Sequence, residues 1–399
     1  MKLPAFYTKE NEMDSALIGE YEARLANVRK EMAKRGFNGL LVFGLAPRRV
    51  GDLMYLTGHQ PLLPGHPRRY GFKGRGYSVI FVPLQQEPCL LTTTPFFEKE
   101  LFIKEVIYGD DLPEEIATSV ILRGIEKKDI GIVGMDILGV SLYEDLKRNL
   151  PRTRFVAADD IVMNLRASKS PYELAIMRRG AGIADEVSDL LRDFLKVGVT
   201  ENDVYRFIVG ELTKRGVTGA FATCQSGERS ESAYDLSPAT DKVIASGDMV
   251  HMEINGKYQG YMIDVCRSTV VGAISDRQRL VLDTALLMFH EAVGGMRPGV
   301  YAEDLEKISG EIALRHGFDS NHTRSFNGPA TFLGHAIGLG VDEPPVVAAG
   351  DMTQLTEGMV ITIEPGLYMT GCGGCRIEDE ILVTPEGSEN LNRSENKWW

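Results

Sequence analysis

The stretch "HMEINGKYQGYMIDVCRST", residues 251–269, contains two carboxylates eleven positions apart, Glu253 and Asp264. Whether they meet depends on where the chain turns. Asn255-Gly256 is the strongest short hairpin signal in the stretch. A turn at that position would leave Asp264 about 20 Å from Glu253, given the rise per residue of a β-strand.

The alternative turn is centred on Tyr258-Gln259, with Gly260 beside it. This turn places Glu253 directly opposite Asp264. Directly opposed residues of an antiparallel pair share one face and are about 5 Å apart. Such a pair can hold a cation, but the stretch alone leaves both turns open.

The composition is that of a globular protein, with 399 residues, 43% hydrophobic and 25% charged, which is long enough for two domains. The net charge of −12 argues against non-specific binding to nucleic acid or to an acidic membrane surface. The N-terminus has no apolar run like that of a signal peptide, and no stretch approaches the length of a membrane span.

Five cysteines, an odd number, are typical of reduced thiols, so we expect a cytoplasmic protein. From the charge and the lack of a membrane span we expect it to bind neither nucleic acid nor membrane. Cys372 and Cys375, in "CGGC", have the spacing of a redox or zinc pair. No second cysteine pair accompanies them, so a turn with two incidental thiols is the favoured interpretation.

Strands and helices are expected to alternate in the first part of the chain. Its apolar runs have the length of strands, and one strand–helix–strand pattern is typical of a βαβ unit in a small α/β domain. The expected strands are 39–44, 77–83, 88–93, 130–134 and 154–159, and the expected helix of the βαβ unit is 140–150.

The second part is expected to be α+β, with long helices and antiparallel hairpins. Two of its helices begin with capping boxes, in which a Ser or Thr precedes an acidic residue by three positions. The expected helix starts are Ser170 with Pro171 and Glu173, Thr200 with Asp203, and Ser275, whose helix runs to Gly294. The expected strands are 248–255, 261–271, 358–364 and 376–383.

A second pair of carboxylates, Glu364 and Glu378, lies fourteen positions apart across a Gly-rich tip centred on Gly371. A hairpin with that tip places the two side chains opposite each other. Taken alone, each acidic residue could be a solvated surface charge. His335, in a Gly-rich loop, could be a structural residue that only makes hydrogen bonds. In apolar surroundings such as "VITIEPG" and "RIEDEILV", however, buried charges need partners. Four carboxylates and one imidazole suit two divalent metal ions, which can activate water and polarise a carbonyl.

The sequence resembles the creatinase/prolidase/methionine aminopeptidase family, which has the "pita-bread" fold. The resemblance rests on "NGLLVFG", "YLTGH", "SKSPYELAIMRR", "GYMIDVCRST", "GHAIGL", "IEPGLY" and "RIEDEILVT", which occur in the order of the family. It implies an N-terminal α/β creatinase-like domain, residues 1–165, and an α+β pita-bread catalytic domain, residues 166–399. It also implies the turn at Tyr258-Gln259 and a centre of two divalent ions (Mn, Zn, Co or Fe). The implied metal ligands are Glu253, Asp264, His335, Glu364 and Glu378.

Three positions depart from the family pattern. Glu253 stands where the family has Asp. Leu236 and Asp342 stand where the peptidases of the family have histidines that support peptide hydrolysis. His251 alternates on the same strand as Glu253, so it is expected to point to the same face and is a candidate to replace one of them; a strand histidine without a role is the alternative.

These features support three functions. The first is a metal-dependent hydrolase of C–N bonds, similar to Xaa-Pro dipeptidases, with Glu364 as ligand and proton shuttle. The second is a small-molecule enzyme on the same fold, either an amidohydrolase like creatinase and ectoine hydrolase or a β-eliminating enzyme like dimethylsulfoniopropionate lyase. Asp342 would then act as the proton-transfer residue. The third is a non-catalytic binding protein, which ranks lowest because one ligand alone is altered.

Arginines are expected to bind the substrate, which is a dipeptide or another small molecule. Arg376 lies beside the expected ligands in sequence, and Arg68 and Arg69 belong to a basic, aromatic loop, residues 66–76. In creatinase-like homodimers the neighbouring N-terminal domain supplies such side chains to the substrate carboxylate, so the resemblance implies a homodimer. A planar guanidinium suits this task because it pairs with a carboxylate through two hydrogen bonds. A solvated loop is the alternative reading of this segment.

Overall fold

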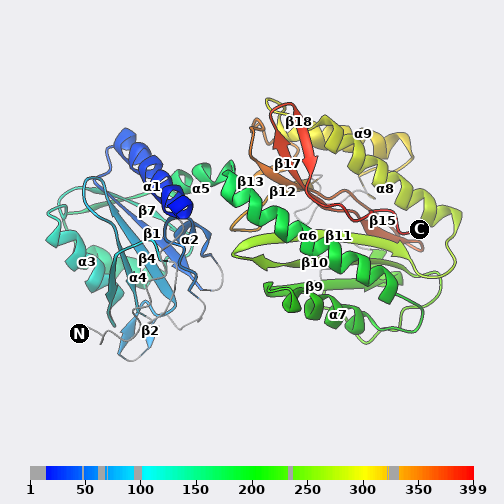
Figure 1. Cartoon of the computed structure of the whole chain (residues 1–399), viewed down its shortest axis with the longest axis horizontal. Coiled ribbons are helices and arrows are strands. Elements are labelled where there is room, and N and C mark those ends of the chain that lie inside the picture. The colour runs from blue at the N-terminus through cyan, green and yellow to red at the C-terminus, as the bar shows by residue number, and fades with distance from the viewer. Residues whose placement is uncertain are drawn as a thin grey trace. The chain divides into compact units, whose positions relative to one another are not determined.

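The structure is a computed structural model that describes residues 15–46, 49–61, 68, 69, 71–93, 101–231, 237–320, 322 and 332–399. The chain divides into two compact units, Met1–Arg166 and Ala167–Trp399. Each unit has its own sheets and helices (Figure 1).

The first unit is built on a mixed sheet with the strand order β6-β5-β4-β1-β7-β8. Its central strands are apolar and, except for Leu45 at the end of β1, buried, as expected for strands that are covered on both faces. The strands are β1 (Gly39–Leu45), β4 (Tyr77–Pro83), β5 (Cys89–Thr92), β6 (Glu105–Tyr108), β7 (Asp129–Val133) and β8 (Arg154–Ala157), with β2 (Arg68–Arg69) paired to β3 (Phe72–Lys73). The helices are α1 (Ser15–Arg35), α2 (Gly51–Thr57), α3 (Leu112–Leu122), α4 (Val140–Asn149) and α5 (Asp159–Ala167).

The βαβ unit expected from the sequence is confirmed. Strands β7 and β8 are parallel neighbours, and α4 connects them. The α/β class of this unit is therefore as predicted, although β1–β4 and β4–β5 are antiparallel pairs.

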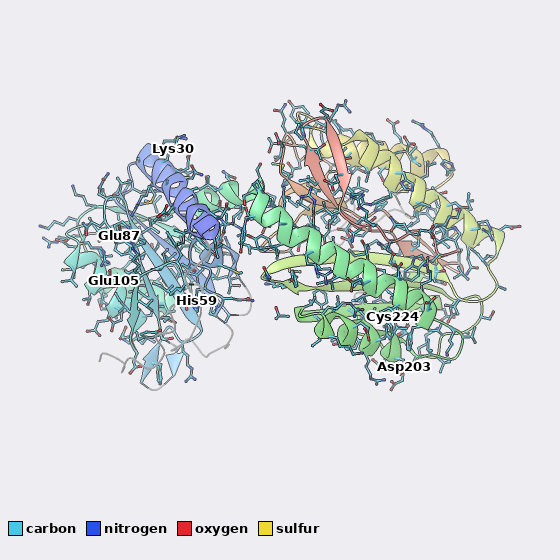
Figure 2. All side chains as sticks on the ribbon, viewed as in Figure 1. Lys30, His59, Glu87, Glu105, Asp203 and Cys224 are labelled. Carbon is cyan, nitrogen blue, oxygen red and sulfur yellow. The ribbon has the colours of Figure 1, made fainter. Side chains whose placement is uncertain are left out.

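The second unit opens with the two helices whose starts the capping boxes predicted. In α6 (Pro171–Phe194), the Ser170 hydroxyl accepts a hydrogen bond from Glu173 N at 3.2 Å. In α7 (Glu201–Lys214), the Thr200 hydroxyl accepts one from Asp203 N at 3.0 Å, and Asp203 marks that end of α7 in Figure 2. The other helices are η1 (Gly227–Glu231), α8 (Asp276–Gly295), which has its own capping box, and α9 (Ala302–Arg315), which was not predicted.

Two larger sheets and the two-stranded sheet of β15 and β16 form the rest of the second unit. One of the larger sheets has the order β11-β10-β9 and packs against α6 and α7, and the other has the order β13-β12-β14-β17-β18 and packs against α8 and α9 (Figure 1). The strands are β9 (Thr218–Ser226), β10 (Met249–Tyr258), β11 (Tyr261–Val270), β12 (Phe332–Ala336), β13 (Glu343–Ala348), β14 (Val360–Ile363), β15 (Gly366–Met369), β16 (Gly373–Arg376), β17 (Asp379–Thr384) and β18 (Gly387–Asn390). No helix of the described residues is long and apolar enough to cross a membrane.

The hairpin of β10 and β11 corrects the predicted register. Tyr258 pairs with Tyr261, so the turn is Gln259-Gly260, one residue later than expected. Both turn residues have positive φ, +48° and +87°, which is the conformation that two-residue hairpin turns require and that suits Gly at the second position. A turn at Tyr258-Gln259 would have forced the bulky Tyr258 into that conformation.

Glu253 is therefore opposite Cys266, and Asp264 is opposite Asn255. The prediction that the two carboxylates are directly opposed is wrong. They still point to the same face, because residues two apart on one strand share a face, and they are diagonal neighbours on the ladder.

The second predicted hairpin is confirmed. Met369 pairs with Gly373, so the tip is centred on Gly371, as expected. The pairs Ile363–Asp379 and Gly366–Arg376 have the same register on either side, and this register places Glu364 opposite Glu378.

Candidate metal centre

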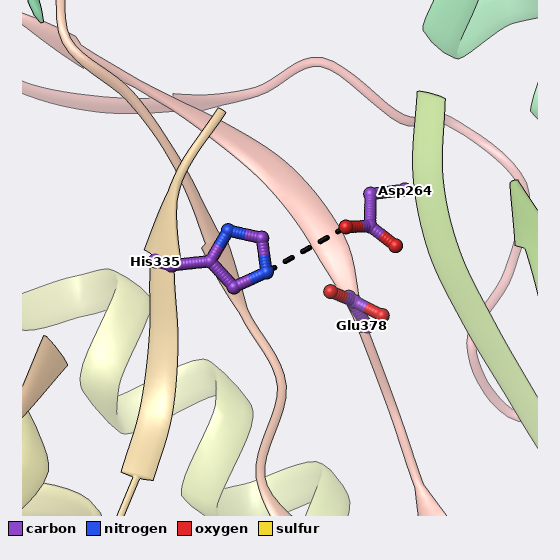
Figure 3. Close-up of side chains that lie close together, drawn as sticks. All are labelled: Asp264, His335 and Glu378. Atoms are coloured by element: carbon purple, nitrogen blue, oxygen red, sulfur yellow. Dashed lines mark ion pairs between the residues drawn. The ribbon is translucent and has the colours of Figure 1, made fainter. Parts of the chain in front are cut away.

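Asp264, His335 and Glu378 converge from three different segments of the second unit. Asp264 lies on β11, His335 lies on β12 and Glu378 immediately precedes β17 (Figure 3). One ligand atom of each lies within 4.8 Å of the others, and all three side chains are buried. Within the described part of the chain, this is the group of His, Cys, Asp and Glu side chains that is compact enough to hold one metal ion.

Backbone contacts bring these segments together. Cys266 on β11 and Glu378 exchange hydrogen bonds between their main chains, at 3.3 and 3.1 Å. Gly334 precedes His335, and a Cβ at Gly334 would lie 1.9 Å from the carbonyl oxygen of Thr362. Only glycine allows β12 to approach the neighbouring strand this closely, and the approach places the next side chain, His335, in the cluster.

The imidazole of His335 is oriented by its own main chain. Its Nδ1 lies 3.1 Å from the carbonyl oxygen of Ala336, so Nδ1–H donates to that oxygen and Nε2 retains its lone pair. Nε2 faces three carboxylate oxygens, Asp342 Oδ1 at 3.5 Å and Asp264 Oδ2 and Glu364 Oε1 at 3.6 Å each.

These separations are too long for hydrogen bonds. They match atoms that bind one ion, since metal–ligand bonds of about 2.1 Å at tetrahedral angles put neighbouring ligand atoms about 3.4 Å apart. The lone pair of Nε2 and the carboxylate oxygens repel one another unless a cation lies between them. The donor set therefore fits a divalent metal ion, which Asp264, His335 and Glu378 would hold with Glu364 beside them.

Burial and mutual repulsion set the protonation of the cluster. Burial is the main cause that raises the pKa of Asp264 to about 7; His335 opposes the rise, and the Glu253 and Glu364 carboxylates contribute to it. Burial also raises the pKa values of Glu364 and Glu378. The buried Oε2 of Glu378 has no hydrogen-bond partner among the described residues. Carboxylates in such a setting need a positive charge, and a metal ion supplies it.

Burial lowers the pKa of the His335 imidazole, but the Glu364, Asp264 and Asp342 carboxylates outweigh burial, so the net shift is upward. The direction agrees with a site built to attract positive charge.

Glu253, for which the resemblance implies Asp in the family, contacts an arginine. Arg376 Nη1 lies 3.0 Å from Glu253 Oε1 and 3.3 Å from Glu364 Oε2, and all three side chains are buried. Arg376 Nε donates to the Tyr368 hydroxyl at 3.2 Å. The predicted ligands Glu253 and Glu364 are thus joined by a guanidinium.

Asp342 lies at the solvent-facing edge of the cluster, with its side chain 70% exposed. It has a positive φ of +55°, which Asp tolerates better than most residues. The loop is held by Glu343, whose Oε1 accepts a hydrogen bond from Gly340 N at 2.7 Å. Asp342 is therefore the carboxylate near His335 that water reaches directly.

His251 extends the same face of β10 away from the ligands. It is buried, and neither ring nitrogen has a hydrogen-bond partner among the described residues. The His251 and Tyr368 rings make an edge-to-face contact, with their centroids 6.3 Å apart. Burial, together with the Arg376 charge, lowers the pKa of His251 to about 3.

Sequence reasoning missed three residues of this site. Asn255 lies opposite Asp264, Cys266 lies opposite Glu253, and Tyr368 holds Arg376. The alternation along β10 and β11 places the first two on the face of the ligands, and it is the signal that would have found them. Of the other candidates, Leu236 lies outside the described residues, and so do the side chains of Arg68 and Arg69, whose backbone forms β2.

Comparison with known proteins identifies the family. Residues 175–385 match "Metallopeptidase family M24", and residues 24–168 match the "Creatinase/Prolidase N-terminal domain". The chain belongs to metallopeptidase family M24. A Xaa-Pro dipeptidase of Pyrococcus horikoshii is 34% identical over 278 residues, which are 69% of this chain and 76% of that protein. A Xaa-Pro dipeptidase of Pyrococcus furiosus is 33% identical over 67% of this chain and 74% of its own length.

Solved M24 structures have the same architecture. The prolidase from Pyrococcus horikoshii OT3 superposes with a TM-score of 0.80 at 28% identity, covering 94% of this chain and 100% of that one. The Xaa-Pro dipeptidase from Bacillus anthracis gives 0.81 at 25% identity, over 94% and 99%. This M24 protein therefore has the predicted pita-bread fold with a creatinase-type N-terminal domain, and it is a metallohydrolase that uses a divalent metal.

Proposed function

We propose that this M24 metallohydrolase cleaves C–N bonds in dipeptides or in similarly small zwitterionic substrates. The observation that carries the proposal is the arrangement around His335, whose Nε2 faces three carboxylate oxygens at 3.5–3.6 Å beside the buried Glu378. The printed names of its relatives, Xaa-Pro dipeptidase and prolidase, support a small peptide as the substrate class.

The chemistry divides between the ion and the side chains. A bound divalent ion lowers the pKa of water and polarises a carbonyl. Glu364, buried beside His335, is assigned the proton shuttle, which takes a proton from the attacking water and passes it to the leaving nitrogen. Asp342, at the solvent edge, is assigned a second proton transfer, in the position where the family has a histidine.

Substrate binding is assigned to residues around this cluster. His251 has two unpartnered ring nitrogens on the ligand face, which suits a polar contact with the substrate. Arg376 was also expected to bind substrate, but it contacts Glu253 and Glu364, so we assign it to the orientation of those carboxylates. Arg68 and Arg69 remain proposed partners for a substrate carboxylate.

The finer points of the proposal rest on the resemblance and the composition. The metal is proposed to be Mn, Zn, Co or Fe, with two ions expected from the family, and the protein is proposed to be a homodimer. A cytoplasmic location is proposed because the thiols of the five cysteines are free and buried or partly buried.

A second candidate function is β-elimination from a small acid, as in dimethylsulfoniopropionate lyase. The exposed carboxylate of Asp342 favours it, because a base at the mouth of the site can remove a proton next to a carboxylate. Hydrolysis of small amides, as by creatinase and ectoine hydrolase, would use the same site, with water as the nucleophile. Binding without catalysis ranks third, because Asp264, His335 and Glu378 form a compact ligand set.

One screen separates these functions. Purified protein is loaded in turn with Mn²⁺, Zn²⁺, Co²⁺ and Fe²⁺ and incubated with Xaa-Pro dipeptides, small zwitterionic amides and sulfonium acids. Release of an amine or amino acid supports hydrolysis, and release of an alkene product supports elimination. Absence of turnover in every class, with a bound metal ion present, rejects an enzyme for these substrates.

A further inference from the structure

We propose that Glu380 is a positioning residue for Asp264, one of the proposed metal ligands, and that the segment of residues 390–396 holds Glu380 in place. Glu380 is assigned no contact with substrate or metal, because it acts through the main chain of Asp264. The inference rests on the proposed metal-dependent function and adds to it a residue that governs how firmly the ion is bound.

The contact lies on the free edge of β11, which is the outer strand of the sheet β11-β10-β9. Three alternate N–H groups of this edge donate to residues outside that sheet. The amides of Met262 and Cys266 donate to main-chain carbonyl oxygens, at 2.8 and 3.3 Å. The amide of Asp264, between them, donates to the side chain of Glu380, whose Oε1 lies 3.1 Å away. A main-chain acceptor is present whatever the residue type, so of these three amides that of Asp264 depends on a particular side chain.

The hydrogen bonding of the Glu380 carboxyl group is directed at Asp264. Glu380 is fully buried, and its other oxygen, Oε2, has no hydrogen-bond partner among the described residues. Burying a carboxyl group costs free energy that burying an apolar side chain does not. An apolar side chain here would, however, leave the buried amide of Asp264 unpaired, which is also costly. The position of Glu380 is therefore explained by what it does for Asp264 and not by packing.

Asp264 is held on both sides of its Cα. Its Oδ1 accepts from the Asn255 side chain at 2.9 Å when that amide is oriented so that its nitrogen faces acceptors. Its main-chain N–H is held by Glu380. Oδ2 is left to face His335 Nε2 at 3.6 Å. Loss of an outer residue that orients a metal ligand typically weakens metal binding about 10–100-fold, so Glu380 should influence the affinity for the ion.

The segment 390–396 holds Glu380 against α6. The main chain of Glu380 is bonded in both directions, since its N–H donates to Asn392 Oδ1 at 3.0 Å and its carbonyl oxygen accepts from Leu391 N at 2.9 Å. Asn392 Nδ2 donates in turn to Asp185 Oδ1 on α6 at 3.2 Å. Asparagine suits this place because its side chain donates and accepts at the same time.

A matched pair of variants tests the hydrogen bond. An amide oxygen accepts from an N–H as a carboxylate oxygen does, so Glu380→Gln keeps the acceptor, whereas Glu380→Met, of similar length, removes it. Mn²⁺ is titrated into each purified protein, and the free ion is followed by its electron paramagnetic resonance signal. Glu380→Met is expected to bind Mn²⁺ about 10–100-fold more weakly than the wild type, and Glu380→Gln within about threefold of it.

A spectroscopic measurement separates positioning from a general loss of stability. The visible absorption of the Co²⁺-loaded protein depends on the arrangement of the ligands. It is expected to change in Glu380→Met and to be restored in Glu380→Gln. Wild-type affinity and spectrum in Glu380→Met, or equal weakening in both variants, overturn the inference and leave the proposed function standing. A wild-type protein that binds no Mn²⁺ rejects the proposed function, and the inference with it.

Glu173→Met is the control for lost stability. Glu173 is also a buried glutamate, and it accepts from the main-chain N–H of Ser170 at 3.0 Å and from the Tyr261 hydroxyl at 2.9 Å. The variant loses both buried hydrogen bonds, so it is expected to unfold at a lower temperature than the wild type. Its Mn²⁺ affinity is expected to stay within about threefold of the wild type. A loss of affinity as large as in Glu380→Met would mean that lost stability alone explains the effect.

Glu380→Asp replaces Glu380→Met if that variant does not fold. It shortens the side chain by one methylene and withdraws the acceptor from Asp264 N, so weaker Mn²⁺ binding than in Glu380→Gln is expected. Equal binding in these two variants would overturn the inference.

Asn392→Ala tests the segment that holds Glu380. It removes the bonds to Glu380 N and Asp185, and weaker Mn²⁺ binding is expected, with the same change in the Co²⁺ spectrum as in Glu380→Met. Ser394→Ala, on the same segment, is the control, since Ser394 donates to Asp189 on α6 and should leave Mn²⁺ binding unchanged. Equal binding in Asn392→Ala and the wild type would show that the segment does not act on the site.

Discussion

The Nε2 atom of His335 lies 3.5 Å from Oδ1 of Asp342, a separation equal within 0.1 Å to its separations from Asp264 and Glu364. Asp342 differs from the other two in exposure, because its side chain is 70% exposed and theirs are buried. A carboxylate at this place can exchange protons with solvent and reach a substrate next to His335. The resemblance to the family implies a histidine at this position in its peptidases.

The variant Asp342→Asn tests this role. Turnover of whichever substrate the screen identifies is expected to fall by about 10²–10⁴-fold, the usual contribution of a general acid or base. Asn tolerates the positive φ of +55° as well as Asp does, so the free energy of unfolding is expected to change by no more than about 0.5 kcal/mol. Steady-state kinetics and thermal unfolding measure the two effects. Glu357→Gln, at an exposed loop position, is the control. Full activity of Asp342→Asn would show that this carboxylate transfers no essential proton.

Metal binding is expected to stabilise the fold through His335. A ligand that binds only the folded state at 100 times its Kd adds about 2.7 kcal/mol to the free energy of unfolding. Thermal unfolding with Mn²⁺ and with a chelator measures this difference in the wild type. His335→Ala should abolish most of it, and His290→Ala, which removes an exposed histidine on α8, should leave it unchanged. An equal metal-dependent shift in His335→Ala and wild type would remove His335 from the ligand set.

His251 makes the stability of the protein depend on pH. Its pKa is about 3 in the folded state, because of burial and then the Arg376 charge, and 6.5 in the unfolded chain. A depressed pKa means that the unfolded chain binds more protons between these values. Stability is therefore expected to fall as pH decreases from about 6.5 towards 3, by at most about 1.4 kcal/mol per pH unit from this residue.

His251→Phe removes this titration and retains an aromatic ring against Tyr368. The variant should lose less stability than the wild type on acidification. Denaturant unfolding at pH 7, 6, 5 and 4 gives the comparison. Parallel curves for the two proteins would mean that His251 is hydrogen-bonded in solution, so that its pKa is not depressed.

The loop of residues 66–76 leads to a prediction about assembly. Arg68 and Arg69 are proposed to reach the site of a second copy, so the protein is expected to be a dimer at micromolar concentration. Light scattering should give twice the mass of one chain. Arg68→Ala and Arg69→Ala are expected to raise KM and leave kcat nearly unchanged, since they affect binding of a substrate carboxylate. A strict monomer rules out the contribution across the dimer.

Sequence reasoning went furthest where turn chemistry left one solution. The Gly-rich tip at Gly371 set the register of β15 and β16, and with it the opposition of Glu364 and Glu378. The capping boxes at Ser170 and Thr200 fixed the starts of α6 and α7, because a side chain that satisfies a free helix N–H is a local feature.

It failed where two neighbouring turns differed by one residue. Turns at Asn255-Gly256 and Tyr258-Gln259 were weighed from the sequence, and Gln259-Gly260, which the requirement of positive φ at both turn positions favours, was not considered. The predicted register paired Glu253 with Asp264, whereas in the structure Glu253 pairs with Cys266. It also concealed Asn255, which lies opposite Asp264.

The last prediction concerns peptidase activity. Wild-type turnover of Xaa-Pro dipeptides is expected to be weak, because the resemblance implies histidines that support peptide hydrolysis at the positions of Leu236 and Asp342. Loss of one polar group at the transition state costs about 2.7–4 kcal/mol, or 10²–10³-fold in kcat. The double variant Leu236→His with Asp342→His is expected to raise kcat/KM for an Ala-Pro substrate by at least tenfold. Leu236→Gln is the control for added polarity without an imidazole. Robust wild-type turnover, with no gain in the double variant, would mean that Glu364 and the metal ion suffice for this reaction.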